Sequence, residues 1–174
     1  MNRRLIVTLA AFAALTVPSG AVSTTTAART GSFDAMGTGT IVLQGKLRVF
    51  GTVQGTMIVR DRFGGAVVRI GGVRQKPKVV RNGDSVVRVY TLRKVDASFY
   101  AKGENIRVEL RSPNATVSMS AFGHGRVMRL DGEGTYHLNG GAEQAWSSTV
   151  VPIAIKPPPP ERPTSRAATN GVAA

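Results

Sequence analysis

The sequence predicts an all-β protein, a single antiparallel β-sandwich or partly closed barrel of short strands. Three observations predict this fold class. Between residues 39 and 155 no segment spaces its apolar residues with a helical period. Short runs of β-branched and aromatic residues are separated by glycines, which is typical of strands and turns. These runs recur about every eight to twelve residues, and this spacing favours a sandwich or barrel.

The strands follow from alternation and turn residues. In residues 105–111, Ile106, Val108 and Leu110 point to one side and charged residues to the other, which predicts one buried face. Residues 115–122 repeat the alternation after a turn at Ser-Pro-Asn. The pair of strands within 76–92 is joined at Asn82-Gly83, a dipeptide that tolerates the positive φ angles of a tight hairpin. Further strands are expected at 40–50, 56–60, 66–70, 96–101, 126–130, 135–138 and 149–155.

Both ends of the chain are expected to lie outside this domain. Residues 1–23 contain a basic start, an apolar run over 5–17 and a break at Pro-Ser-Gly, the order of a secretory signal peptide. Cleavage is expected after Ser23, with Ala21 and Ala28 as alternatives. Residues 24–38 predict a linker, and residues 156–174, which begin with a proline run, predict a disordered tail.

The predicted signal peptide and the composition indicate where the domain at 39–155 is located in the cell. The chain has no cysteine, so neither a disulfide nor a lipid-modified cysteine is available. No second long apolar segment predicts a transmembrane helix. Abundant arginine, alanine, glycine and valine with few lysines fit a bacterium with a GC-rich genome. We therefore expect a protein of a bacterial cell envelope or a secreted protein.

Glycines at 39, 45 and 51 stand six residues apart and introduce an alternative fold. Repetition this short is typical of the rungs of a β-helix, in which small residues turn each corner. Residues 39–60 resemble the glycine-punctuated rungs of bactofilins, bacterial scaffold proteins with a β-helical core. The resemblance implies a short-rung solenoid. It covers about 22 residues, and the hairpin signals over 80–138 favour the antiparallel fold.

Both histidines lie in the glycine-rich stretch 123–141, and we interpret this stretch as a β-hairpin rather than a metal site. If the turn spans 131–134, His124 and His137 are roughly 13 Å apart along the ladder at about 3.3 Å per residue. One zinc ion would need both nitrogens at about 2 Å. A two-residue turn at Asp131-Gly132 would bring the histidines diagonally closer. We predict no metal and no cofactor.

No catalytic motif is present. The sequence has no His-Glu-x-x-His, Gly-x-Ser-x-Gly or Ser-x-x-Lys pattern, and no thiol nucleophile. The carboxylates that a glycosidase would need are available, although their spacing selects no pair. These candidates are Glu104, Glu109, Glu133 and Glu143. We predict a protein that is not an enzyme, with a secreted carboxylate-dependent hydrolase as the alternative.

Charge is the feature that suggests a partner. The chain has a formal net charge of +13. Between residues 69 and 94 eight cations accompany the single acid Asp84, which predicts a basic face that attracts polyanions. The predicted binding residues are Arg69, Arg74, Lys76, Lys78, Arg81, Arg88, Arg93 and Lys94.

The expected partner is an anionic polymer of the cell wall or the membrane surface. The competing interpretation of the charge is a merely solvated surface. Nucleic acid is a less favoured partner, because it would require exposed aromatic rings beside the cations. Tyr90, Phe99 and Tyr100 are the nearest rings, and their expected role is core packing.

Overall fold

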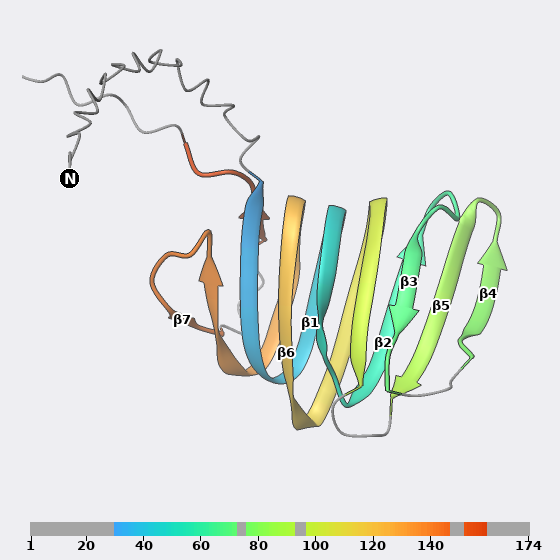
Figure 1. The fold of residues 1–174 in the computed structure, drawn as a ribbon, viewed down its shortest axis with the longest axis horizontal. Helices are drawn as coiled ribbons and strands as arrows, with labels where there is room; N and C mark the ends of the chain where they lie inside the picture. The colour runs from blue at the N-terminus through green and yellow to red at the C-terminus, as the bar shows by residue number, and fades with distance from the viewer. Residues whose placement is uncertain (1–29, 73–75, 93–96, 147–151, 160–174) are drawn as a thin grey trace, which may run out of the picture.

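The structure is a computed structural model that describes residues 30–72, 76–92, 97–146 and 152–159. This part of the chain contains strands and no helix, so the all-β prediction is confirmed. The strands form one antiparallel sheet in the order β1-β6-β2-β5-β4, with β3, β7 and β8 also paired to β6, and the sheet does not close (Figure 1). The bounds are β1 Gly31–Thr52, β2 Gly55–Asp61, β3 Val67–Ile70, β4 Lys78–Asn82, β5 Ser85–Leu92, β6 Ser98–Leu138, β7 Gln144–Ala145 and β8 Ile153–Ile155.

The two longest strands, β1 and β6, bend repeatedly, and the bends fold the sheet over on itself. Ala121 of β6 pairs with Phe33 on one side and with Val49 on the other. One strand segment therefore lies between two turns of β1. Figure 1 shows the long ribbons curving at one end and continuing behind. The outgoing chain β1–β3 and the returning chain β6 thus wind around a common core in opposite directions.

The winding divides the sheet into two limbs that face each other across the core. Within each limb neighbouring segments pair antiparallel. The first limb contains residues 31–37, 47–52, 67–70, 98–103, 117–123 and 133–138. The second limb contains residues 39–45, 55–61, 78–82, 85–92, 106–112, 125–131 and 153–155.

Glycines stand where the chain crosses between the limbs. Gly39 has a φ of 132° and pairs with Gly132, whose φ is 127°. A Cβ on Gly39 would overlap the carbonyl oxygen of Asp131, and a Cβ on Gly132 would overlap that of Thr38. The glycines that stand six residues apart in the sequence thus lie at corners of the chain, as the sequence indicated. The pairing across these corners is antiparallel, however, whereas a short-rung solenoid stacks successive turns of one chain directly on each other.

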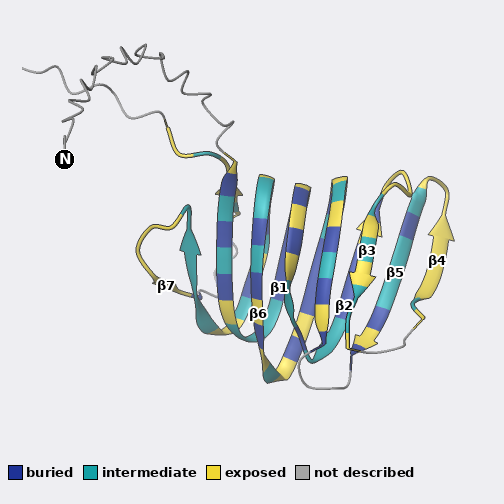
Figure 2. Ribbon diagram, in the orientation of Figure 1, coloured by how far each residue is buried: buried dark blue, intermediate teal, exposed yellow. Residues whose placement is uncertain are grey.

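Side chains from both limbs meet in one apolar core. Odd-numbered residues of β1 and β2 point inward from Phe33 to Val59, and even-numbered residues point outward, as the pleat requires. Figure 2 shows the resulting buried and exposed bands along the long strands, while β4 is exposed throughout. Tyr90 and Phe99 are buried in this core, which confirms their predicted role. The same prediction is wrong for Tyr100, which is only half-buried and lies on the outer side of the sheet, opposite Phe50 and Arg69.

The first and last strands close one end of the core. The indole nitrogen of Trp146 donates to the Thr135 carbonyl at 3.0 Å, and its backbone amide donates to Gly134 at 2.9 Å. Asn139, at φ 53°, accepts a hydrogen bond from the Ser32 amide through Oδ1 at 2.9 Å. Its Nδ2 donates to the Lys156 carbonyl, which joins the ends of β1, β6 and β8.

Several predicted boundaries are wrong and others are confirmed. The linker expected over 24–38 is strand from Gly31 onward, because Phe33 and Ala35 pack into the core. The hairpin predicted within 123–141 is absent: β6 continues through it and pairs with β1 instead. The hairpin at Asn82-Gly83 is confirmed by the pairing of β4 with β5. The predicted signal peptide and most of the tail lie outside the described residues.

Candidate polyanion-binding faces

The basic cluster predicted from the sequence does not form one face in the part of the chain that the structure describes. Arg74, Arg93 and Lys94 lie outside the described residues. Arg69 lies on β3 in the first limb, opposite Tyr100. The other four belong to or precede the β4–β5 hairpin of the second limb, namely Lys76, Lys78, Arg81 and Arg88.

Strand pairing separates these four cations further. Residues directly opposite in an antiparallel pair share one side of the sheet. Lys78 lies opposite Val89, on the outer side, whereas Arg81 lies opposite the buried Val86, on the inner side. Arg88 also points inward, and its Nη1 donates to the Ala66 carbonyl at 3.4 Å.

Arg88 borders the core at the open end of the sheet. Burial raises the pKa of the neighbouring Tyr90 hydroxyl, and the positive charge of Arg88 opposes that shift. Arg88 is therefore an edge residue of the core rather than part of an outer binding surface.

A larger group of cations lies on the outer side of the second limb, and we call it the arginine face. Its members come from β2, β4 and the residues 106–131 of β6. Strand register places all of them on the same side of the sheet. The arginine face consists of Arg60, Lys78, Arg107, Arg111, Arg126 and Arg129.

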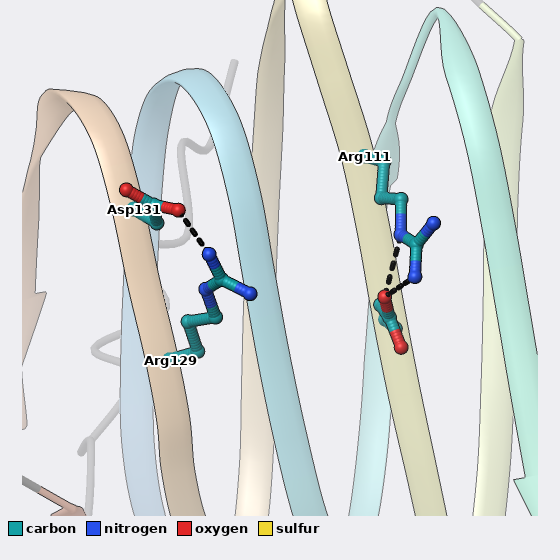
Figure 3. Close-up of polar contacts among 4 residues, drawn as sticks. Arg111, Arg129 and Asp131 are labelled. Carbon is teal, nitrogen blue, oxygen red and sulfur yellow. Dashed lines mark hydrogen bonds and ion pairs between the residues drawn. The ribbon is translucent and has the colours of Figure 1, made fainter. Parts of the chain in front are cut away.

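Two carboxylates on this face are already occupied by arginines (Figure 3). Arg111 donates through Nε to Oε1 of Glu109 at 2.6 Å, and its Nη2 lies 2.5 Å from the same oxygen. Arg129 forms an ion pair with Asp131. In both cases the partners are two residues apart on β6, so they lie on the same side of the strand.

The middle of the arginine face is shielded from solvent although it points away from the core. Val42, Glu109 and Ile58 lie side by side on three neighbouring strands, and Glu109 is only 8% exposed. Long arginine side chains surround them on the same face, and their methylene stems cover apolar surface while the charged groups stay in water. The guanidinium groups therefore stand on a packed layer.

Three arginines on this face have no acidic partner among the described residues. Gln44 lies between Arg126 and Arg107, and Arg107 lies directly opposite Arg60. At about 4.8 Å per strand this row spans roughly 14 Å. Among the described residues no carboxylate is within ion-pair distance of any of the three arginines. A hollow of about 600 Å³ borders the Arg126 end and is also lined by Gln44 and His124.

Like charges directly opposite each other destabilise an antiparallel pair, typically by some tenths of a kcal/mol. An anion bound between Arg107 and Arg60 would replace this repulsion with attraction. Arginine also presents a planar fork of donors that fits phosphate and carboxylate groups in a bidentate way. The row is therefore suited to bind a chain of anionic groups that runs across the strands.

Within the part of the chain that the structure describes, the histidines and the remaining glutamates do not form a recognisable reactive cluster. In the described residues no group of three metal-ligating side chains is found. His124 pairs with Lys46 of β1 and His137 pairs with Asp34, at separate places along that strand. Nε2 of His137 instead lies 3.5 Å from Oε2 of Glu143. The hydrolase alternative stays a prediction.

The individual signals of the arginine face were visible in the sequence. Arg107 and Arg111 alternate with core residues on the predicted strand 105–111, and this alternation indicated a solvated face. Sequence spacing could not show that Arg60 lies opposite Arg107, because 47 positions separate them in the printed numbering. Only the pairing of β2 with β6 brings them together.

No family model matches the chain, and no curated protein or solved structure matches it. The residues that the structure describes include no helix long and apolar enough to cross a membrane.

Proposed function

We propose that the bent sheet acts as a β-sandwich whose arginine face binds an anionic polymer outside the cytoplasm, as a non-catalytic module of the cell envelope. The polymer carries repeated phosphate or carboxylate groups. The observation that supports this proposal is the row of Arg126, Arg107 and Arg60, which crosses adjacent strands without any acidic partner in the described residues.

The physical basis is electrostatic and independent of polymer sequence. Each cation that neutralises a polymer charge releases condensed counterions, so affinity falls steeply with salt concentration. Because Glu109 and Asp131 already neutralise two arginines, Lys78 and the three row arginines carry the binding. A rigid sheet holds them in place before the polymer arrives, which reduces the ordering cost of binding.

The test is a salt series with the purified protein and long-chain polyphosphate as the probe. Vesicles that contain an anionic phospholipid form a parallel arm that distinguishes a membrane surface from a soluble polymer. For a double variant, Arg60→Gln with Arg107→Gln, we expect the slope of log K against log salt to fall by about 1.4–1.8, at roughly 0.7–0.9 per lost contact. Isolated cell envelope then replaces the probe.

The control is a second double variant, Arg62→Gln with Arg81→Gln, which removes the same charge from two exposed positions: Arg81 lies on the inner side of β4, and Arg62 lies beyond the end of β2. We expect it to keep the wild-type slope. Equal losses in both variants would show that net charge alone drives binding. A larger loss in Lys78→Gln with Arg81→Gln would assign binding to the hairpin that the sequence singled out. Either result would overturn the role of the arginine row.

A further inference from the structure

The outer side of the first limb carries a second group of cations, interspersed with aromatic rings. We call it the aromatic–basic face. Its members lie on β1, β3 and the residues 98–103 and 117–123 of β6, and strand register places them on the outer side. The aromatic–basic face consists of Lys46, Arg48, Phe50, Arg69, Tyr100, Lys102 and Phe122.

Cations and rings are arranged in two rows across the strands. In the first row Arg48 lies between Phe122 and Lys102. In the second row Tyr100 lies between Phe50 and Arg69. Arg48 and Lys102 are therefore like charges directly opposite each other, as Arg107 and Arg60 are on the arginine face.

The rings hold the cation in place. Phe50 and Phe122 stack with centroids 5.8 Å apart and planes at 12°, and Cζ of Arg48 lies 5.4 Å from the Phe122 ring centre. A guanidinium above an aromatic ring is attracted by the ring quadrupole and keeps its outer donors free. Phe50 is 39% exposed, so this stack lies at the surface.

Acidic groups leave most of this charge available. Glu104 lies 2.8 Å from Nζ of Lys46, and Asp34 accepts a hydrogen bond from Ser120 at 2.5 Å. No carboxylate among the described residues is within ion-pair distance of the other three cations, which are Arg48, Arg69 and Lys102. A hollow of about 290 Å³ on this face is lined by Lys46, Arg48 and Lys102 together with Tyr100 and Phe122, and also by Glu104, the partner of Lys46.

The two faces point in opposite directions, because the limbs that carry them pack against each other through one core. Packed sheets lie about 10 Å apart, so the charged ends of the two groups are separated by more than the core thickness. One short polymer segment therefore cannot contact both faces at once.

We propose that the protein is a two-sided polyanion binder that bridges two anionic polymer chains, one on each limb. This inference rests on the proposed function of the arginine face and adds a second site and a cross-linking activity. Once one face is bound, the other presents a preformed cationic site to a neighbouring chain. Bridging then strengthens through multivalency, because each polymer holds many protein molecules.

Cross-linking is measured by light scattering and by sedimentation of long-chain polyphosphate at low salt. A titration with a phosphate oligomer too short to reach from one face to the other gives the number of sites. Three double variants are compared. Arg48→Gln with Lys102→Gln removes the aromatic–basic site, Arg60→Gln with Arg107→Gln removes the arginine site, and Arg62→Gln with Arg81→Gln is the control of equal charge.

We expect the wild-type and control proteins to bind two oligomers and to sediment the long polymer. Each single-face variant should bind one oligomer and lose sedimentation at least tenfold, while far-UV circular dichroism stays that of folded β-protein. Wild-type sedimentation by Arg48→Gln with Lys102→Gln would overturn the second site. Binding of one oligomer by the wild type would overturn bridging and leave the proposed function standing, whereas no binding at low salt would refute both.

Discussion

Gly39 offers the sharpest test of how the winding of the sheet is built. Substitution with alanine is opposed by two features of the structure, an unfavourable backbone angle and a lack of space for the Cβ. The backbone φ of 132° is one that residues with a Cβ rarely adopt, and the new Cβ would overlap the Asp131 carbonyl oxygen and lie 2.9 Å from Cα of Gly132. Both obstacles involve main-chain atoms, so neither is relieved by rotation of a side chain.

The expected cost follows from these two terms. A residue held in a glycine-only backbone region costs about 1–3 kcal/mol. Insertion of a methyl group into filled space costs about 1–3 kcal/mol more. Alanine also reduces the conformational entropy of the unfolded chain, which stabilises the folded state by about 0.4–1 kcal/mol. The net loss is therefore about 1–5.5 kcal/mol, a large share of the roughly 5–15 kcal/mol by which domains are stable.

Three other glycines separate the two terms. Gly65 has neither obstacle, so Gly65→Ala should change stability by less than about 0.5 kcal/mol. Gly83 has a φ of 55° and no atom within 4 Å of a built Cβ, so its alanine variant should lose only the backbone term, about 1–2 kcal/mol. Gly134 has no positive φ, but its Cβ would lie 2.7 Å from Cε2 of Trp146, so its variant should lose only the packing term.

The assay is denaturant unfolding followed by far-UV circular dichroism, with the fluorescence of the single tryptophan, Trp146, as a second probe. Coincidence of the two transitions tests two-state behaviour. We expect Gly39→Ala to be the least stable of the four variants. If it unfolds at the same midpoint as Gly83→Ala, close contact between crossing strands does not constrain the corner, and the reasoning is refuted.

Three further predictions concern single side chains. Glu109→Gln frees Arg111 on the arginine face, so affinity for polyphosphate at low salt should rise severalfold; an unchanged or lower affinity in the salt series would contradict the placement of this carboxylate. Asn139→Gly keeps the φ of 53° but loses the side-chain hydrogen bonds to Ser32 and Lys156, so it should lower the free energy of unfolding by about 1–2 kcal/mol. Asn139→Ala should lower it further, because alanine disfavours that φ. Denaturant unfolding of both variants checks which of the two is less stable. Burial raises the pKa of Tyr90 above its ordinary value, so the unfolded state ionises first and stability falls as pH rises above about 10; Tyr90→Phe should flatten this loss between pH 9 and 11, and an unchanged slope would exclude Tyr90 as its source.

Local pattern was sufficient wherever one strand segment determines its own structure. The alternation of Ile106, Val108 and Leu110 placed them correctly in the core, and Asn82-Gly83 correctly located a hairpin. Both signals depend only on residues that are close together in the sequence. They need no knowledge of the pairing partner, because the pleat and the turn conformation are local properties.

Prediction failed where a segment depends on a distant partner. Residues 31–37 look like a linker, since their small and polar composition has little strand preference, yet they pair on both sides with β6. The stretch 123–141 has the composition of a hairpin, yet its glycines serve as corners against β1. In both cases tertiary pairing overrides the local preference, as is usual for strands.

For the candidate site, too, the sequence predicted the local features and missed the long-range ones. The sequence indicated a strongly basic chain and singled out 69–94, and the structure distributes the described cations of that segment over different sides of the sheet. The arginine row takes its members from three segments that are distant in sequence. Such a row depends on register, which a sequence without an alignment does not specify across long separations.

The sequence by itself determined the all-β class, the inward and outward sides of the individual strands and the excess of positive charge, because each of these follows from residue type and a period of two. The tertiary structure alone decided that the glycines spaced six residues apart lie at the bends of an antiparallel sheet rather than a solenoid, and that cations from distant strands share the outer side of that sheet. Long-range pairing chooses between arrangements whose local preferences are alike, and it does so through close main-chain contact at the corners and burial of one shared core.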